Sequence, residues 1–256
     1  MAVTEQKKDF PEFYLTSPQP CPYLAGRLER KLFTHLSHDK PSHVIDNLLR
    51  GGFRRSQNIA YIPYCDGCSS CVSVRVPVDT FEPSRSQRRI TKRNRDLLAT
   101  RAVAIPTTEQ YGLFRRYIDS RHYDGGMADM SMLDYAMMIE DSIVDTFISE
   151  YRLAPDGGIS TDPEDGALAG VALNDLLSDG VSMVYSFFNT ELPERSLGTY
   201  MVLEHIEYAR SLGLPYVYLG YWINGSRKMS YKDRFRPQQH LTEEGWVTIY
   251  PGEIVD

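Results

Sequence analysis

The clearest pattern of hydrophobic and polar positions lies in the C-terminal half of the chain. Residues 181–188 form an apolar run of β-branched and aromatic side chains, which predicts a buried strand. Residues 196–212 keep apolar side chains at helical spacing and stop at Gly213, so they predict a helix. Residues 214–222, rich in Tyr and Val, predict a second strand. Strand, helix and strand at this spacing form a βαβ unit, and we therefore expect a mixed α/β (α+β) fold.

Periodicity predicts further elements before this unit. Residues 72–78 alternate apolar and polar side chains, as expected for a strand with one buried face. A helix capped by Ser84 is expected to run to about Thr100. The other expected elements are strands over 30–36, 144–153 and 167–177, helices over 42–50, 107–122 and 131–141, and a polar strand or extended loop over 53–61. For residues 30–36 a helix is the alternative.

The chain changes character near residues 100 to 106. All four cysteines and a strongly basic segment lie before that point, and the βαβ unit lies after it. The sequence therefore predicts an N-terminal part over residues 1–104 and a C-terminal domain over residues 105–256.

The composition is that of an ordinary globular protein, with 42% hydrophobic and 24% charged residues among 256. No apolar run approaches the roughly 18 residues of a membrane span, and no membrane partner is expected. The first ten residues lack the apolar core of a secretory signal, so we expect a cytoplasmic protein. Four cysteines in such a protein do not indicate a disulfide framework.

The net charge of −6 conceals a concentrated basic segment, from Arg85 to Arg95, that contains no acidic residue. On a helix, its basic side chains recur three and four positions apart and form one stripe. Contact with RNA phosphates is the functional interpretation, and a solvated helix face is the alternative. The residues expected to bind RNA are Arg85, Arg88, Arg89, Lys92 and Arg93, with Arg54 and Arg55 from an earlier polar segment.

Three cysteines recur at the spacing of metal ligands. They are Cys65, Cys68 and Cys71, and Cys21 would complete a set of four. Thiolates two residues apart can turn back onto one soft metal ion. The alternative is a group of small buried cysteines in a tight, glycine-containing turn. Spacing does not distinguish zinc from an iron–sulfur cluster.

The turn that enters the helix over 196–212 carries a further motif. Arg195-Ser-Leu-Gly-Thr-Tyr200 resembles the R/Q-x-x-G-x-G/A turn of GNAT acyltransferases, whose backbone N–H groups hold the pyrophosphate of coenzyme A. The resemblance implies a GNAT-like acyltransferase fold, in which the reaction lies where neighbouring central strands part. Tyr200 stands where the motif has a small residue, and we expect its bulk to crowd a pyrophosphate. An acyl donor other than acetyl-CoA is therefore expected.

Longer segments carry a more specific resemblance. They are GFRRSQNIAYIPYCDGCSSCVSVRV, FEPSRSQRRITKRN, and SLGTYMVLEHIEYARSLGLPYVYLGYWI followed by SRKMSYKDRFRP. Over about residues 21–237 the chain is similar to the arginyl-tRNA–protein transferase family, and RHYDGGMADM resembles its bacterial branch, the aspartate/glutamate leucyltransferases. The resemblance implies transfer of leucine from leucyl-tRNA to proteins with N-terminal Asp or Glu, which marks them for N-end-rule degradation. It also implies that the basic stripe contacts tRNA.

In the implied reaction, the α-amine of the acceptor attacks the ester carbonyl that joins an amino acid to tRNA. No cofactor is required beyond the aminoacyl-tRNA co-substrate, because the ester is already activated. A base or a desolvated site is needed, because only a neutral amine attacks. The alternatives are the same reaction with arginyl-tRNA, a CoA-dependent GNAT N-acetyltransferase, and a metal-stabilised RNA-binding module without enzymatic activity.

Five residues are candidates for the reaction site. Histidine titrates near neutral pH, so His122, at a predicted helix end, is a candidate general base, with Arg121 beside it as a candidate for acceptor binding. The alternative for His122 is a structural role at the last carbonyls of the helix. Tyr221, at the end of a predicted central strand, is a second catalytic candidate. Lys228 and Lys232 match the family's KMxYK motif and are expected to bind the acidic side chain of the acceptor.

Overall fold

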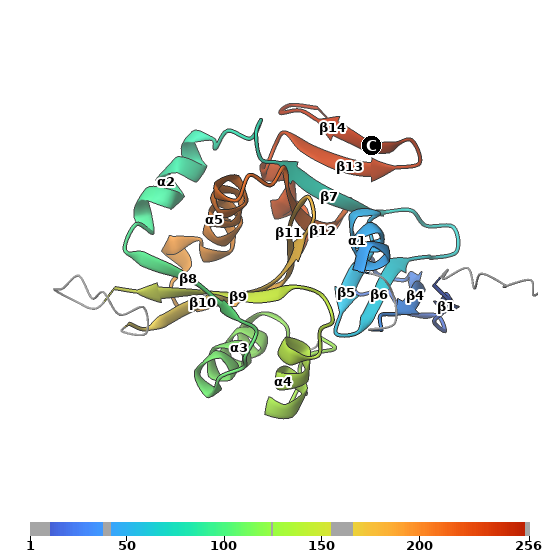
Figure 1. Ribbon diagram of the computed structural model, residues 1–256, viewed down its shortest axis with the longest axis horizontal. Helices are drawn as coiled ribbons and strands as arrows, with labels where there is room; N and C mark the ends of the chain where they lie inside the picture. The colour runs from blue at the N-terminus through green and yellow to red at the C-terminus, as the bar shows by residue number, and fades with distance from the viewer. Residues whose placement is uncertain (1–10, 38–41, 124, 155–165, 254–256) are drawn as a thin grey trace, which may run out of the picture.

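The computed structural model describes residues 11–37, 42–123, 125–154 and 166–253. In these residues the chain forms an eight-stranded sheet and two smaller sheets (Figure 1). The large sheet contains, in spatial order, β14 (Gly245–Ile249), β13 (Gln238–Thr242), β7 (Cys71–Pro77), β12 (Tyr216–Ile223), β11 (Gly180–Phe188), β10 (Leu168–Leu177), β9 (Thr146–Leu153) and β8 (Leu97–Val103). Its neighbouring strands are antiparallel except for β11 and β12, which are parallel.

Helices cover both faces of the large sheet, as Figure 1 shows. The helices α2 (Arg85–Arg93) and α5 (Leu197–Ser211) lie on one face, and α3 (Thr108–Arg121) and α4 (Met132–Glu140) lie on the other. Met201 and Ile206 of α5 belong to a buried cluster that includes strand residues of β7 and β11. On the opposite face the Phe114 ring of α3 lies 5.5 Å from the Phe187 ring of β11. Burying each such side chain contributes roughly 1.5–3 kcal/mol.

The two parallel strands at the centre of the sheet part from each other. They pair only where Gly180 to Ser182 of β11 face Tyr216 to Tyr218 of β12, although β11 continues to Phe188. Beyond this stretch β12 has a register irregularity before Gly220 in its pairing with β7. A gap therefore opens between β11 and β12 toward their C-terminal ends, and the expected GNAT-like α/β architecture is confirmed.

The N-terminal part forms a smaller sheet that packs against the large one, at the right of Figure 1. Ala60 shares a buried cluster with Leu177 of β10 and Tyr218 of β12, so the two sheets have a common core. The elements of this part are β1 (Tyr14–Leu15), β4 (Lys31–His35), β6 (Ile59–Pro63) and β5 (Arg54–Ser56) in sheet order, α1 (Ser42–Arg50), and the pair β2 (Gln19–Pro20) and β3 (Leu28–Glu29).

Most predicted elements are confirmed, but the predicted helix end near Thr100 is wrong. The α2 helix stops at Arg93, because the buried Asn94 caps it and donates its Nδ2 hydrogens to the carbonyls of Ile90 (3.0 Å) and Arg195 (2.8 Å). Residues 97–103 instead form β8, which pairs with β9 along its whole length. The strands β13 and β14, which were not predicted, extend the other edge of the sheet.

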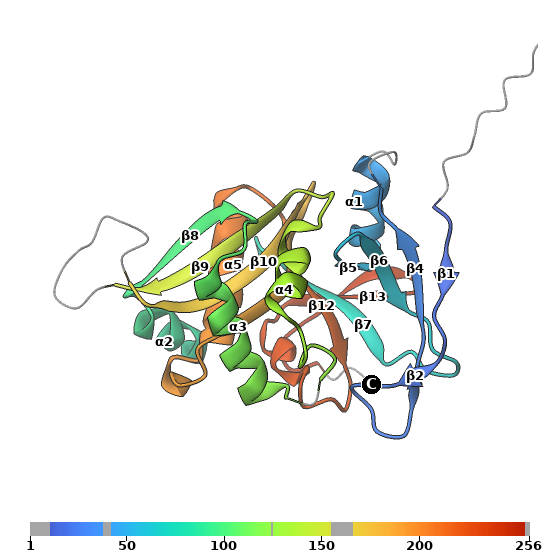
Figure 2. The same cartoon turned by 90° about the horizontal axis from the view of Figure 1, so that it is seen from below.

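The division predicted near residues 100 to 106 does not coincide with an interruption of the sheet. The strands β7 and β8 lie within residues 1–104 of the chain, but they belong to the same eight-stranded sheet as β9 to β14. Figure 2 shows β7 running beside β12 through the middle of the molecule. No helix in the described residues combines the length and apolar character needed to cross a membrane.

Candidate functional site

Arg54 of β5 reaches into the gap between the two central strands. Its Nη2 donates hydrogen bonds to the carbonyls of Met183 (3.0 Å) and Val184 (2.7 Å), which follow the paired stretch of β11. Carbonyls on a strand that has lost its neighbour need a donor, and the guanidinium supplies one. Arg54 therefore ties the N-terminal sheet to β11 at the point where β11 and β12 part.

Gly220 gives this guanidinium its space on the β12 side. The residue has a φ of 74°, which favours glycine, and a Cβ there would lie 2.0 Å from Nη1 of Arg54, so any side chain would displace the guanidinium. That Nη1 is buried and has no hydrogen-bond partner within the described residues. An unpaired buried donor costs roughly 1–3 kcal/mol. Nη1 of Arg54 can therefore still donate a hydrogen bond to another group in the gap.

Lys232 lies on η2 (Ser230–Arg234), the 3-10 helix that follows β12, and it too faces this region. The residue is 6% exposed, and its Nζ donates a hydrogen bond of 2.6 Å to the carbonyl of Tyr221. Burial, and secondly the charge of Arg54, lower the pKa of Lys232 well below its usual value. We expected Lys232 to act as a fixed cation, but its surroundings favour the uncharged amine. Lys228 is exposed, away from these buried contacts.

Tyr221 contributes its backbone to the gap and directs its hydroxyl elsewhere. The hydroxyl lies 3.1 Å from the carbonyls of Gly52 and Tyr61 in the N-terminal part and can donate to only one of them at a time. Burial raises the pKa of this phenol far above its ordinary value. The hydroxyl thus joins β12 to the N-terminal part, and the catalytic role predicted for it is not supported by this geometry.

His122 and Arg121 lie at the C-terminal end of α3, as predicted. The His122 backbone N–H donates to the carbonyl of Ile118, and its ring lies 5.6 Å from the ring of Tyr117. The Tyr117 ring lies 5.1 Å from that of Phe188, the last residue of β11. His122 is therefore half-buried near the open end of the gap, whereas Arg121 is exposed.

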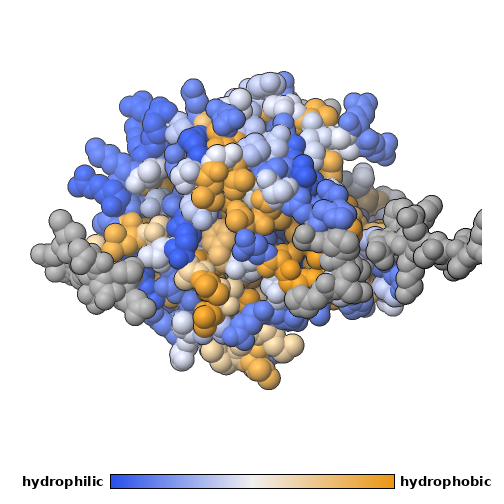
Figure 3. Space-filling model, in the orientation of Figure 1, coloured by the Kyte–Doolittle hydropathy of each residue, from blue (hydrophilic) through white to orange (hydrophobic). Residues whose placement is uncertain are grey.

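The basic stripe of α2 is exposed, and Figure 3 shows strongly hydrophilic side chains over this helix. Its C-terminal end lies against the turn that enters α5, because Arg93 donates to the carbonyl of Glu194 and Asn94 to that of Arg195. Arg195 in turn makes two hydrogen bonds of 2.8 Å to Asp96. The stripe thus leads to the start of α5. Its exposed basic residues are Arg85, Arg88, Arg89, Lys92, Arg93 and Arg95.

Two residues that were expected to bind RNA make their hydrogen bonds within the protein instead. Arg54 lies in the gap, and the Arg55 side chain is fully buried, with two hydrogen bonds of 2.7 Å to Asp175. A guanidinium that is paired in this way has no donors left at the surface for a phosphate. Arg54 and Arg55 therefore do not extend the basic surface of α2, and this part of the prediction is corrected.

Tyr200, in the turn motif, is 8% exposed, and its ring packs edge-on against Tyr151 at 5.9 Å. Its bulk is accommodated in the core beneath α5, which corrects our reason for excluding a pyrophosphate. Ser196 at the start of the helix has a φ of 52° and no side-chain capping bond. Backbone N–H groups of the first turn therefore remain available to an anion.

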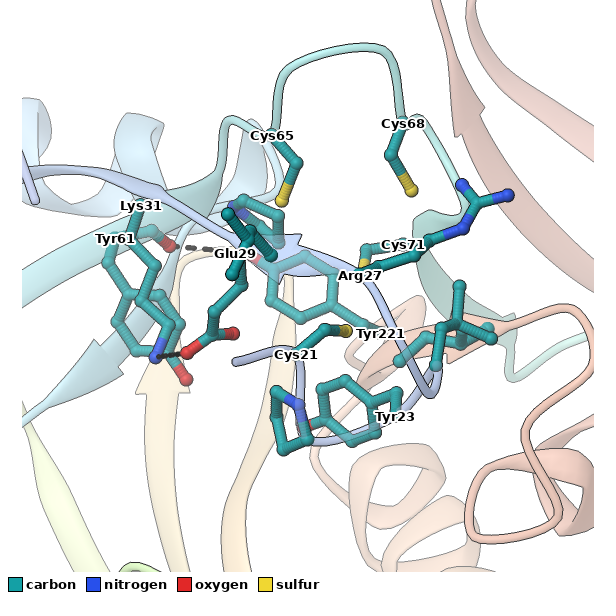
Figure 4. A pocket seen from close by; sticks show the side chains of 15 residues that line it. Cys21, Tyr23, Arg27, Glu29, Lys31, Tyr61, Cys65, Cys68, Cys71 and Tyr221 are labelled. Atoms are coloured by element: carbon teal, nitrogen blue, oxygen red, sulfur yellow. Dashed lines mark hydrogen bonds and ion pairs between the residues drawn. The ribbon is translucent and has the colours of Figure 1, made fainter. Parts of the chain in front are cut away.

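All four cysteines line one cavity of about 70 Å³ beside β6 and β12 (Figure 4). Burial first, and then Cys65, Cys21 and Cys68, raise the pKa of the Cys71 thiol to about 12. A set of four sulfur donors suits zinc or an iron–sulfur cluster chemically. In the described residues, however, no three cysteine, histidine or acidic side chains are placed to hold an ion. The loop that carries the cysteines would have to close further for a metal to fit.

Comparisons with known proteins match most of the chain. Residues 19–89 match the family model described as arginine-tRNA-protein transferase, N terminus, and residues 109–242 match arginine-tRNA-protein transferase, C terminus. An aspartate/glutamate leucyltransferase of Afipia carboxidovorans is 58% identical over 96% of both chains. One of Azorhizobium caulinodans is 58% identical over 96% of this chain and 99% of its own. The crystal structure of FemX covers 80% of this chain and 67% of its own, with a TM-score of 0.47 and 13% identity.

Proposed function

The chain belongs to the arginine-tRNA-protein transferase family, and from that premise we propose that it transfers leucine from leucyl-tRNA to proteins that begin with Asp or Glu. The observation that carries the proposal is the gap between β11 and β12, which brings a guanidinium and a buried amine together. A reaction between an ester and an amine needs these two kinds of group, one to bind and one to accept a proton.

The surroundings of the gap favour a leucyl over an arginyl donor. Aromatic side chains come from both sides of it, Tyr185 from β11 and Tyr231 from η2. An arginyl side chain would need an acidic partner when it leaves water, whereas a leucyl side chain needs only apolar contact. The relatives at 58% identity are also named for a leucyl donor.

We assign the proton transfer to Lys232. The uncharged Nζ takes a proton from the α-ammonium group of the acceptor, and the free amine attacks the ester carbonyl carbon. The new C–N bond forms as the C–O bond to the ribose of the tRNA breaks. The proton on Lys232 passes to the departing ribose oxygen, and the nitrogen releases its second proton to water, so that a neutral amide and free tRNA result. A positioned base of this kind contributes about 10²- to 10⁴-fold. His122 and Arg121, at the open end of the gap, remain candidates for contact with the substrates.

The tRNA phosphates would lie along the exposed stripe of α2. Its end adjoins the start of α5, where backbone N–H groups and the positive end of the helix dipole favour an anion. Because β11 borders the gap nearby, the 3′ end of the tRNA would reach the gap from this side. Coenzyme A is disfavoured as donor for a different reason, since an extended ligand added to the free edge of β11 would have to displace Arg54.

A transfer assay tests the proposal directly. Purified protein is given labelled leucyl- or arginyl-tRNA together with peptides that begin with Asp, Glu, Arg or Ala. We expect transfer of leucine to the Asp and Glu peptides only. Transfer of arginine alone would change the donor, and acetylation from acetyl-CoA would overturn the proposal.

We further propose that the enzyme acts in the cytoplasm, marks its acceptors for N-end-rule degradation, and binds zinc or an iron–sulfur cluster at its cysteines. Support for the metal is the single cavity that the four cysteines line. Replacing Cys68 and Cys71 by Ser should release the metal and lower the melting temperature. Protein prepared anaerobically without zinc or iron would remove the metal from the proposal and leave the cysteines with a structural role.

A further inference from the structure

We infer that Arg54 is the residue that recognises the acidic side chain of the acceptor, by donating hydrogen bonds from Nη1 to its carboxylate. The inference rests on the proposed function and adds to it the means by which acceptors are selected. The guanidinium of Arg54 is a planar fork of N–H donors, which matches the geometry of a carboxylate. The lysine beside it, Lys232, is driven toward its uncharged form and is a poor partner for an anion.

The hydrogen bonds of Arg54 leave one side of its guanidinium free for a ligand. Nη2 is occupied by two carbonyls of β11, whereas the buried Nη1 has no partner in the described part of the chain. Carbonyl oxygens satisfy donors but do not neutralise the positive charge. A carboxylate in the gap would supply both the missing acceptor and the opposite charge, and such charge-assisted bonds are the stronger kind.

The separation of the two groups on the substrate fits the pair of residues in the gap. In an N-terminal Asp or Glu, the α-amine and the carboxyl carbon are only a few covalent bonds apart. A site that binds the carboxylate and deprotonates the α-amine therefore needs a cation and a base side by side. Arg54 and Lys232 satisfy this condition, because Nη1 of Arg54 lies against Gly220 of β12 and Nζ of Lys232 donates to the carbonyl of the next residue, Tyr221.

The fold keeps the guanidinium in one place, as specificity requires. Two bonds to β11 hold it on one side, and the absence of a side chain at Gly220 admits it on the other. A Cβ at position 220 would lie 2.0 Å from Nη1, which is too close for two non-bonded atoms. Gly220→Ala should therefore dislodge Arg54 while leaving its charge in the protein.

The test compares peptides that begin with Asp or with the isosteric Asn. For wild type and Arg54→Met we would measure kcat/KM for leucyl transfer, and peptide Kd by fluorescence anisotropy without tRNA. We expect Arg54→Met to reduce the preference for Asp over Asn by roughly 10- to 150-fold in both measurements, with little change for Asn. Arg54→Lys should retain part of the preference, and Arg116→Met, an exposed arginine on α3, should retain all of it.

The outcomes separate this inference from the proposed function. An equal loss for both peptides would mean that Arg54 serves the donor ester, and an unchanged preference would mean that Nη1 binds only water; either result overturns the inference. If wild type transfers no leucine, the proposed function fails, and peptide binding still tests Arg54. If Arg54→Met does not fold, Gly220→Ala and Arg54→Lys decide by the same ratio, with thermal melting to verify their folding.

Discussion

Arg54 and Arg55 are neighbours on β5, yet they end in two different kinds of environment. Successive side chains of a strand point to opposite faces, so the two guanidinium groups lie on opposite sides of β5. That of Arg55 is fully buried, paired through two bonds of 2.7 Å with Asp175, and supported by the hydroxyl of Thr146. That of Arg54 meets two carbonyls and keeps an unpaired Nη1.

Arg55 is thus a polar group that stabilises the fold, whereas Arg54 is one that can bind a ligand. The junction at Arg55 is complete, because charge is balanced and the donors that it directs at Asp175 and Thr146 have acceptors. The gap at Arg54 is incomplete in both respects. Since a buried group without a partner is costly, an incomplete cluster survives only where something else compensates, and a substrate is the simplest candidate.

Breaking the complete junction should produce the largest loss of stability. Arg55→Met leaves the buried Asp175 carboxylate without its partner and should lower the free energy of unfolding by about 3–5 kcal/mol. Arg54→Met removes an uncompensated charge together with two hydrogen bonds and should change it by about 1 kcal/mol or less. Urea denaturation measures both. The double variant Arg55→Met, Asp175→Leu should recover most of the loss; if it does not, packing rather than the ion pair explains the effect.

A second satisfied cluster lies beneath α5, and it should make stability depend on pH. His205 is fully buried, its Nδ1 lies 2.7 Å from the carbonyl of Met201, and burial lowers its pKa to about 4. The unfolded chain then binds more protons than the folded one between this value and the ordinary pKa near 6.5. The contribution of uncharged His205 to the free energy of unfolding is fully present above pH 6.5. It should fall by about 3 kcal/mol as the pH drops to 4.

Denaturation curves at pH 7 and pH 4.5, for wild type and His205→Gln, measure this dependence. The variant should be less stable at pH 7 and lose less on acidification. Equal slopes for both proteins would assign the acid sensitivity to other groups.

At the gap that contains Arg54 and Lys232, a substitution should lower activity but raise stability. Lys232→Met removes an amine whose burial opposes its charge, so the free energy of unfolding should rise by about 0.5–2 kcal/mol. Leucyl transfer should fall by about 100-fold, the lower end for a lost base. Single-turnover transfer and urea denaturation provide the two measurements. A variant that is both less stable and fully active would place Lys232 with the structural group, beside Arg55.

The smallest effect is expected at the exposed stripe of α2. Reversing the charge of Arg88 and Lys92 should weaken tRNA binding and reduce the slope of log Kd against log salt by roughly 0.9 for each phosphate that the helix no longer binds. Arg116→Glu, on the opposite face of the sheet, is the net-charge control for each of the two reversals made singly, because each of these variants changes the charge by two units. If a single reversal and this control lower the slope equally, α2 acts through total charge and not as a binding surface.

The regular elements of the fold were predictable because their signals are local. The helix over 107–122 and the strands over 181–188 and 214–222 follow from periodicity, and α3, β11 and β12 confirm them. The end of α2 is not a local property. Residues 97–103 become a strand because β9, about fifty positions later in the chain, offers them a partner.

The site was less predictable than the fold for a similar reason. The cysteines and the basic stripe are visible as spacings, and the structure gathers the first and exposes the second. Nothing in the segment around Arg54 and Arg55 shows that one reaches β11 and the other Asp175 of β10, since those partners come from distant residues. One local signal was available, because Gly220 inside an otherwise bulky strand indicates the close approach of another group.

Because Arg54 and Lys232 lie together, binding and basicity are thermodynamically linked. The guanidinium of Arg54 opposes protonation of the Lys232 amine and so lowers its pKa. A carboxylate bound to Arg54 offsets that opposition, and by reciprocity a proton on Lys232 strengthens the hold on the carboxylate. An acidic acceptor would thus increase the proton affinity of the base that activates its own amine, while a neutral one would meet a weaker base. The enzyme would then select its acceptor twice with one charge, once by affinity and once by reactivity.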